Sequence, residues 1–410
     1  MTKIRNYIVV TSAYWGFTLT DGALRMLVLL HFHTLGYSPF ELAALFLLYE
    51  LMGIMTNLIG GWLGARFGVK LTLLSGLAIQ VFSLLLLSLL NPLWSAMFSL
   101  VFVLFAQGLS GVAKDLSKMS SKSAIKLVVP KNNHPRLFKL VALLTGSKNA
   151  LKGAGFFMGG VLLSLCGFVY ALWIMAGALF ALLILSGWLL PSSMGKSSAK
   201  AKMREVFSKS KPINILSIAR VFLFGARDVW FVVALPVFLL SELNWSFKAV
   251  GGFLALWIIG YGIVQSFAPS LIKSSDDGHS KELKYASVWM VILCLVTLAI
   301  TLAIQAQYHI TLSLLFGLAI FGFCFAVNSA LHSYLILNFS NVDNVALSVG
   351  FYYSANAAGR LLGTLLSGIA YQIAGLTGAL VVALSMLIIA TVFTMLLGPA
   401  FNRVEANQIQ

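Results

Sequence analysis

The sequence predicts an all-α polytopic membrane protein with twelve transmembrane helices in two six-helix bundles, and three observations lead to this prediction. The 410 residues are 60% hydrophobic and 10% charged, with a mean hydropathy of +0.94, a composition outside the range of soluble domains. The apolar stretches have the length of about 20 residues that a membrane helix needs, whereas barrel strands would be shorter and would alternate. One long polar segment divides these stretches six and six.

The expected helices follow one another with short loops. The first is too long, and has the wrong flanks, for a cleaved signal peptide. The approximate cores of the spans are 7–32, 40–62, 71–90, 94–113, 138–165, 168–190, 213–240, 249–272, 285–306, 309–336, 345–372 and 377–398.

A basic segment at 191–212 separates the expected N-terminal bundle, 1–190, from the C-terminal bundle, 213–410. We interpret this segment as a cytoplasmic linker. Its basic residues are Lys196, Lys200, Lys202, Arg204, Lys209 and Lys211.

A weak internal repeat supports the division into two bundles. A shift of 207 residues places 147–153 (SKNALKG) on 354–360 (SANAAGR), and a shift of 208 places 35–38 (LGYS) on 243–246 (LNWS). In transporters built from such repeats, the substrate site lies near the middle of the membrane, where the halves face each other.

The net charge of +16 is distributed unevenly along the chain. Of the 28 Lys and Arg residues, we place 21 in loops or termini on one side of the membrane, only Lys248 on the other side, and six within spans. The 21 are Lys3, Arg5, Arg66, Lys70, seven from Lys114 to Lys139, six from Lys196 to Lys211, Lys273, Lys281, Lys284 and Arg403. This asymmetry predicts an inner-membrane protein with both termini in the cytoplasm, where anionic lipid rather than nucleic acid accounts for the basic loops.

Four lysines recur every four residues after the fourth expected span. They are Lys114, Lys118, Lys122 and Lys126. We expect the span to continue here as a basic amphipathic helix along the inner membrane surface. The alternative is an electropositive funnel that concentrates anions at the cytoplasmic mouth.

The sequence offers few residues for catalysis or for binding a metal. The three cysteines, Cys166, Cys294 and Cys324, are scattered, and no Cys/His cluster occurs. We find no nucleophile–base pair and no ATP-binding motif. We therefore expect no metal, no cofactor and no enzymatic activity, and we predict a monomeric transporter driven by an ion gradient.

Charged residues inside the spans predict an anionic substrate. Each such charge costs about 3 kcal/mol or more in a membrane helix, so it needs a compensating group. Six cations stand against three acids, Asp21, Glu50 and Asp228. The expected substrate ligands are Lys148, Lys152, Arg25, Arg227 and Arg360, with Asn149 and Asn356 nearby. The sixth cation, Arg220, lies nearer the cytoplasmic end, and we expect it to extend toward the interface.

The lysine pair makes the expected site asymmetric. Lys148 and Lys152 lie one turn apart on one helix face, with no acid next to them in the sequence. The repeat places them opposite Ala355 and Gly359, with Arg360 just beyond. The sequence therefore favours anion binding mainly in the first bundle. An alternative role for Asn149 and Asn356 is hydrogen bonding between helices.

The three acids are candidates for proton coupling. Structural roles, such as ion pairing, remain as alternatives. Asp21 and Arg25, four residues apart, could form an internal salt bridge. Glu50 could be protonated or could pair with a cation on a neighbouring span. Arg227 and Asp228 point about 100° apart on a helix, so we expect them not to pair and at least one of them to face the cavity.

The loop between the second and third spans, GWLGARFGVK at 61–70, resembles the signature loop of the major facilitator superfamily. Gly61, Arg66, Gly68 and Lys70 fit that signature, whereas Ala65 stands where the family usually has an acid. The resemblance implies a twelve-helix transporter that works by alternating access, in which these four residues act during the conformational change.

Three longer segments, 6–40, 111–127 and 143–160, are similar to the organoarsenical-efflux permeases of the ArsJ type. The similarity implies export of 1-arseno-3-phosphoglycerate, which glyceraldehyde-3-phosphate dehydrogenase forms from arsenate and which falls apart outside the cell. A phosphate and arsenate ester suits Lys and Arg ligands rather than thiols. An exporter of other metabolites or drugs, and an importer of phosphate esters, remain open alternatives.

Overall fold

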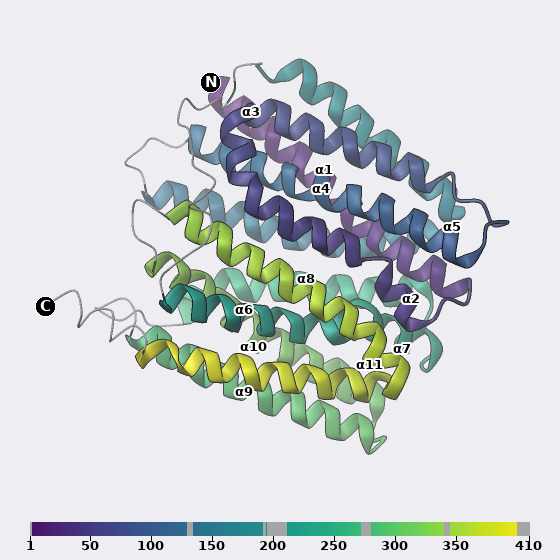
Figure 1. Ribbon diagram of the computed structural model, residues 1–410, viewed down its shortest axis with the longest axis vertical. Helices are drawn as coiled ribbons and strands as arrows, with labels where there is room; N and C mark the ends of the chain where they lie inside the picture. The colour runs from purple at the N-terminus through teal and green to yellow at the C-terminus, as the bar shows by residue number, and fades with distance from the viewer. Residues whose placement is uncertain are drawn as a thin grey trace, which may run out of the picture. The chain divides into compact units, whose positions relative to one another are not determined.

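The computed structural model describes residues 2–128, 134–191, 194, 211–271, 280–339 and 345–399, all helical apart from turns and short connections. The elements are α1 (Thr2–Thr34), α2 (Pro39–Ala44), α3 (Leu47–Leu87), α4 (Ala96–Val128), α5 (His134–Leu189), α6 (Lys211–Val229), the π-helix η2 (Trp230–Ala234), α7 (Leu235–Ser241), α8 (Phe247–Leu271), α9 (Ser280–Gln305), α10 (Ile310–Asn338) and α11 (Val345–Met395) (Figure 1). The predicted all-helical fold is confirmed.

Three of these helices bend sharply at a glycine with positive φ. The bends lie at Gly68 (φ 80°) in α3, Gly167 (φ 74°) in α5 and Gly375 (φ 59°) in α11, and Figure 1 shows α3 as two arms joined by such a bend. Side chains with a Cβ rarely adopt this backbone conformation, which explains glycine at each bend. Each bend coincides with a predicted boundary between two spans.

Nine stretches of the described chain are long and apolar enough to cross a membrane. Two of them, Gly146–Leu189 and Phe351–Pro399, have 44 and 49 residues and contain a bend. Since one crossing takes about 20 residues, each of these two stretches is long enough for two crossings.

The chain forms two compact units. The first comprises residues 1–37, 44–203 and 245–259, and the second comprises residues 38–43, 204–244 and 260–410. The boundary between the units therefore falls within α8.

Close helix contacts in the first unit depend on glycine. A Cβ added to Gly22 of α1 would lie 2.6 Å from the carbonyl oxygen of Lys152 in α5, and one added to Gly111 of α4 would lie 2.5 Å from that of Tyr49 in α3. Small residues let helix backbones approach this closely in a membrane. As a result, α1, α3, α4 and α5 bring their polar side chains into one region.

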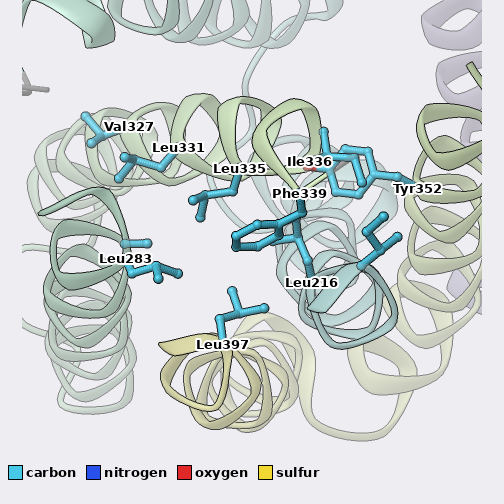
Figure 2. Packing of buried hydrophobic residues seen from close by; sticks show 11 residues of the cluster. Leu216, Leu283, Val327, Leu331, Leu335, Ile336, Phe339, Tyr352 and Leu397 are labelled. Carbon is cyan, nitrogen blue, oxygen red and sulfur yellow. The ribbon is translucent and has the colours of Figure 1, made fainter. Parts of the chain in front are cut away.

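The second unit has an apolar cluster formed by α6, α9, α10 and α11 together with the residues that follow α10 and α11 (Figure 2). Tyr352, Leu335 and Leu216 are completely buried in it. Truncating such a leucine to alanine typically costs 2–5 kcal/mol, so the cluster holds these helices firmly. Its members are Ile213, Leu216, Leu283, Ala286, Val327, Leu331, Leu335, Ile336, Phe339, Tyr352 and Leu397.

The helix that begins at Lys211 passes through one wide turn before it ends. In η2, the backbone N–H of Leu235 reaches the carbonyl oxygen of Trp230, five residues back, just before Pro236. Proline has no N–H to give and its ring clashes with the carbonyl four residues earlier, so a widened turn relieves that contact. The hydroxyl of Ser367 in α11 accepts the N–H groups of Val233 and Ala234, at 3.2 and 3.1 Å.

Candidate functional site

An ion pair between α1 and α3 lies in the interior of the first unit. Arg25 Nη1 is 3.0 Å from Glu50 Oε1, and the Glu50 side chain is fully buried. The guanidinium also lies 5.0 Å from the centroid of the Phe46 ring. Of the alternatives above, Glu50 thus pairs with a cation on a neighbouring span, and Arg25 pairs with Glu50 rather than with Asp21.

Asp21 interacts instead with a tyrosine. The Tyr49 hydroxyl donates to both carboxylate oxygens of Asp21, at 2.7 and 3.0 Å, and both residues are buried. Because Tyr49 precedes Glu50 on α3, one turn of α3 contacts both Asp21 and Arg25 of α1. This arrangement links Asp21, Arg25, Tyr49 and Glu50 in a single polar cluster.

A second group of charges, on α4, adjoins this cluster. Lys114 Nζ lies 3.9 Å from the centroid of the Tyr49 ring, a cation–π contact. Lys118 Nζ lies 2.9 Å from Asp115 Oδ1 and donates to Asn57 Oδ1 of α3 at 2.7 Å. Asp115 is fully buried, so the charged groups of the first unit extend from α1 through α3 to α4.

The expectation of a surface-lying helix at this point is wrong for its first turns. Lys114 and Lys118 lie on α4, partly buried, inside the stretch Ala96–Ser121 that is long and apolar enough to cross a membrane. The side chains of Lys122 and Lys126 lie outside the described residues. A spacing of four is typical of a solvated helix face, whereas the first two lysines contact Tyr49, Asp115 and Asn57.

Small residues on the same stretch were the signal that sequence reasoning missed. Ser117, Ser120 and Ser121 are all buried, and a Cβ added to Gly76 of α3 would lie 2.5 Å from the Ser117 hydroxyl oxygen. Small residues at helical spacing indicate a helix–helix contact in the membrane. They would have placed this part of α4 inside the bundle, and Asp115 with it.

The predicted lysine pair lies on α5, next to α1. Lys148, Asn149 and Lys152 are all partly buried, and Lys152 Nζ lies 5.7 Å from the centroid of the Phe156 ring. The carbonyl of Lys152 faces Gly22, the residue after Asp21. The turn that carries Lys152 therefore packs directly against the turn that carries Asp21.

One acid in the second unit is shared by two arginines. Arg227 Nε donates to Asp228 Oδ1 at 2.7 Å, and Arg360 Nε of α11 donates to Asp228 Oδ2 at 3.3 Å. The expectation that Arg227 and Asp228 do not pair is therefore wrong. Their Cβ atoms diverge, but the long arginine side chain curls back to the carboxylate, with its guanidinium 4.9 Å from the Phe224 ring centroid.

Arg220 lies inside the second unit and does not extend toward the interface, so that expectation is also wrong. It is 4% exposed, and its Nε donates to Asn356 Oδ1 of α11 at 3.0 Å. Its Nη1 donates to the carbonyl oxygen of Ser329 in α10 at 3.2 Å. The guanidinium carbon lies 3.9 Å from the Phe224 ring centroid and 5.0 Å from that of Tyr352. Asn356 thus makes a hydrogen bond between helices.

The predicted signature loop coincides with the bend of α3. Gly68 forms the bend, and Lys70 Nζ donates to the carbonyl oxygens of Gly187 and Leu190, at 2.9 and 2.5 Å. A lysine at the last carbonyls of a helix satisfies acceptors that have no partner within the helix. The side chains of residues 60–67, which include Gly61 and Arg66, lie outside the described part of the chain.

Long apolar helices that enclose charged and polar clusters are typical of a multi-pass membrane protein with a functional interior. A sequence profile of the Major Facilitator Superfamily matches residues 7–274 and 216–409, and the chain belongs to that family. It is therefore a multi-pass membrane protein and a secondary transporter of small molecules, not an enzyme.

Similar solved structures agree with this fold. One is a POT family transporter in complex with a thioalcohol-conjugated peptide, with a TM-score of 0.75 and 13% identity over 96% of this chain and 95% of that one. Another comes from work on proton-dependent oligopeptide transporters (TM-score 0.73, 14% identity, 98% and 99% coverage). A third is a variant of the nucleoside transporter NupG (TM-score 0.71, 16% identity, 98% and 100% coverage). No curated protein sequence matches the chain significantly.

Proposed function

We propose that this transporter exports a small organic oxyanion by alternating access, with 1-arseno-3-phosphoglycerate as the specific substrate, and thereby gives arsenate resistance. It would lie in the inner membrane with both termini in the cytoplasm, as the distribution of basic residues suggests. The observation that carries the proposal is the excess of basic over acidic side chains in the charged clusters of both units.

The excess holds for each unit separately. Among the charged residues of the site described above, the first unit contributes five basic residues and three acids, and the second contributes three basic residues and one acid. The basic residues are Arg25, Lys114, Lys118, Lys148, Lys152, Arg220, Arg227 and Arg360, and the acids are Asp21, Glu50, Asp115 and Asp228. A membrane interior with more cations than acids is stabilised when an anion binds. Arginine and lysine are also the usual ligands of phosphate-like groups.

The specific substrate is supported by the similarity of three segments to organoarsenical permeases. In that pathway glyceraldehyde-3-phosphate dehydrogenase joins arsenate to the triose, so the proposed transporter depends functionally on that enzyme. The charged clusters suit such a substrate, since it carries a phosphate at one end and an arsenate at the other.

Arsenate resistance in a sensitive host tests this proposal. The gene is expressed with and without glyceraldehyde-3-phosphate dehydrogenase, and growth and cellular arsenic are followed in arsenate medium. We expect resistance and lower cellular arsenic only when both proteins are present. Unchanged growth and arsenic content with both proteins would rule out the arsenical substrate.

The Arg25–Glu50 pair favours a second candidate function, the import of a phosphate ester with a proton. An anion that binds Arg25 would draw the guanidinium away from the fully buried Glu50 carboxylate, which would then bind a proton more readily. Proton and anion would thus move in the same direction. One of the similar structures concerns proton-dependent transporters, although of oligopeptides.

Proteoliposomes with an imposed pH gradient separate the two directions. Import with a proton predicts that 3-phosphoglycerate accumulates inside vesicles whose external medium is the more acidic. Export in exchange for protons predicts accumulation when the lumen is the more acidic. If the anion replaces Glu50 as the partner of Arg25, Glu50→Gln should remove the dependence of transport on the pH gradient in either case.

A further inference from the structure

Arg220 differs from the other arginines inside the described membrane helices. Arg25 lies against Glu50, and Arg227 and Arg360 lie against Asp228. Among the described residues, Arg220 forms no ion pair with any acid, although only 4% of its surface is exposed. A guanidinium buried in this way needs an anion from another source.

The surroundings of Arg220 hold its guanidinium in one orientation. Nε and Nη1 donate to Asn356 Oδ1 and to the Ser329 carbonyl oxygen, while the rings of Phe224 and Tyr352 lie within 3.9 and 5.0 Å of the guanidinium carbon. Nη2 makes no hydrogen bond to the residues described. The planar fork is therefore oriented in advance and keeps donors for an oxyanion.

The groups around this arginine are neutral hydrogen-bonding side chains rather than carboxylates. The Ser329 hydroxyl accepts from Tyr261 Oη at 3.3 Å and from Gln265 Nε2 at 3.2 Å. His332, one turn beyond Ser329, is fully buried and its Nε2 lies 3.4 Å from the Thr394 hydroxyl. The guanidinium of Arg227 also lies against the Phe224 ring, so a fixed cation with neutral hydrogen-bonding groups and a second cation nearby attracts an anion and repels a cation.

We propose that Arg220 is a further substrate ligand in the second unit, and that it binds a phosphate, arsenate or carboxylate group through two parallel hydrogen bonds. Asn356 acts as its positioning residue. This proposal rests on the anionic substrate proposed above, and it adds Arg220 to the ligands already expected in the second unit, Arg227 and Arg360.

Binding of known oxyanions to the purified full-length protein tests the role of Arg220. The melting temperature in detergent is followed as 3-phosphoglycerate, inorganic phosphate or inorganic arsenate is added, with glycerol as the uncharged probe. The variants are Arg220→Gln and Arg220→Lys, and the matched control is Arg5→Gln, which alters an exposed arginine on α1.

We expect at least one oxyanion, but not glycerol, to raise the melting temperature of the wild type and of Arg5→Gln with the same apparent Kd. Arg220→Gln should weaken that apparent affinity at least tenfold. Arg220→Lys should weaken it less, because lysine keeps the charge but loses the two-pronged geometry. If Arg220→Gln does not fold, the comparison of Arg220→Lys with Arg5→Gln decides.

Two results would overturn the proposal. If the role of Arg220 is purely structural, Arg220→Gln lowers the melting temperature of the protein without ligand and leaves the apparent Kd of the oxyanion unchanged. A wild-type protein that none of the three oxyanions stabilises would also exclude an anion site at Arg220. Either result leaves the arsenate-resistance experiment to decide the proposed function separately, since resistance can persist without this ligand.

Discussion

The two units place similar acids in different electrostatic surroundings. Asp21 of α1 and Asp228 of α6 are separated by 207 residues, the shift that also relates the repeated segments. Asp21 accepts hydrogen bonds from a tyrosine, whereas Asp228 is shared by two arginines. The same shift pairs Arg220 with the buried Ala13. Among the described residues, the first unit pairs Arg25 with Glu50 and Lys118 with Asp115, whereas the second unit holds, besides the pairs of Asp228, a buried arginine without an acid beside it, Arg220.

This difference suggests a division of roles. In a buried pair such as Arg25–Glu50, the carboxylate can bind a proton when the arginine moves away, which is what coupling to a proton gradient requires. An oriented arginine such as Arg220 can bind an anion without first giving up a carboxylate. We therefore expect substitutions at the Arg25–Glu50 pair to change mainly stability and pH dependence, and substitutions at Arg220 to change mainly anion affinity.

Breaking the Arg25–Glu50 pair should have the largest effect. Arg25→Met or Glu50→Gln alone leaves one partner of a buried pair in place, and such changes cost about 3–5 kcal/mol. The double variant Arg25→Met with Glu50→Gln removes both charges and should recover part of the loss. Melting temperatures in detergent measure both effects, with Arg5→Gln as the control. A double variant that is less stable than either single variant would show that the two side chains do not stabilise each other.

Removing the Tyr49 hydroxyl should have the next largest effect. Tyr49→Phe takes away the donor to Asp21 but keeps the ring beneath Lys114, so we expect a loss of about 1–3 kcal/mol, the cost of an unmet hydrogen bond to a buried charged group. Tyr49→Leu should lose more, because the cation–π contact also disappears. Chemical denaturation or melting gives the comparison, and Tyr170→Phe, at a 63% exposed tyrosine, is the control. Equal stability of Tyr49→Phe and Tyr170→Phe would contradict the role of the hydroxyl.

Neutralising Asp21 and Asp228, which the shift of 207 residues relates, should change anion affinity differently in the two units. Asp228→Asn releases Arg227 and Arg360 from a competing carboxylate, so we expect about tenfold tighter binding of 3-phosphoglycerate, equivalent to about 1.4 kcal/mol. Asp21→Asn should change the affinity much less, because asparagine still accepts from Tyr49 and no arginine is released. Titrations monitored by melting temperature measure both variants. Equal effects of the two substitutions would mean that the units do not differ in this respect.

The sequence predicted the fold better than the site, for physical reasons visible in particular residues. Apolar length and glycine positions are local properties, so the spans and the bends at Gly68 and Gly167 follow from the sequence. The pairing of charged side chains, in contrast, depends on how the helices pack. Sequence spacing suggested Asp21 as the partner of Arg25, but the close approach of α1 and α3 brings Glu50 there instead.

Three charged residues were misplaced because neighbours that contact them in space are far away in the chain. The basic face of Lys114 and Lys118 resembled a membrane-surface helix until α3 supplied Tyr49 and Asn57. The position of Arg220 along the span suggests the membrane interface, whereas the groups that accept its hydrogen bonds come from α10 and α11. For the two lysines, the small residues Ser117, Ser120 and Ser121 were the available signal that this part of α4 belongs to the interior.

The smallest predicted effect concerns the wide turn that follows the arginines of the second unit. Ser367→Ala removes the hydroxyl that accepts the N–H groups of Val233 and Ala234, which should cost about 1 kcal/mol or slightly more. Ser385→Ala is the matched control, since that exposed serine donates only to a carbonyl of its own helix. Hydrogen exchange at the amides of Val233 and Ala234 should become faster in Ser367→Ala but not in Ser385→Ala. Because the turn begins two residues after Asp228, a loosened π-helix should also weaken anion binding slightly. Unchanged exchange at these amides would show that Ser367 does not maintain the turn.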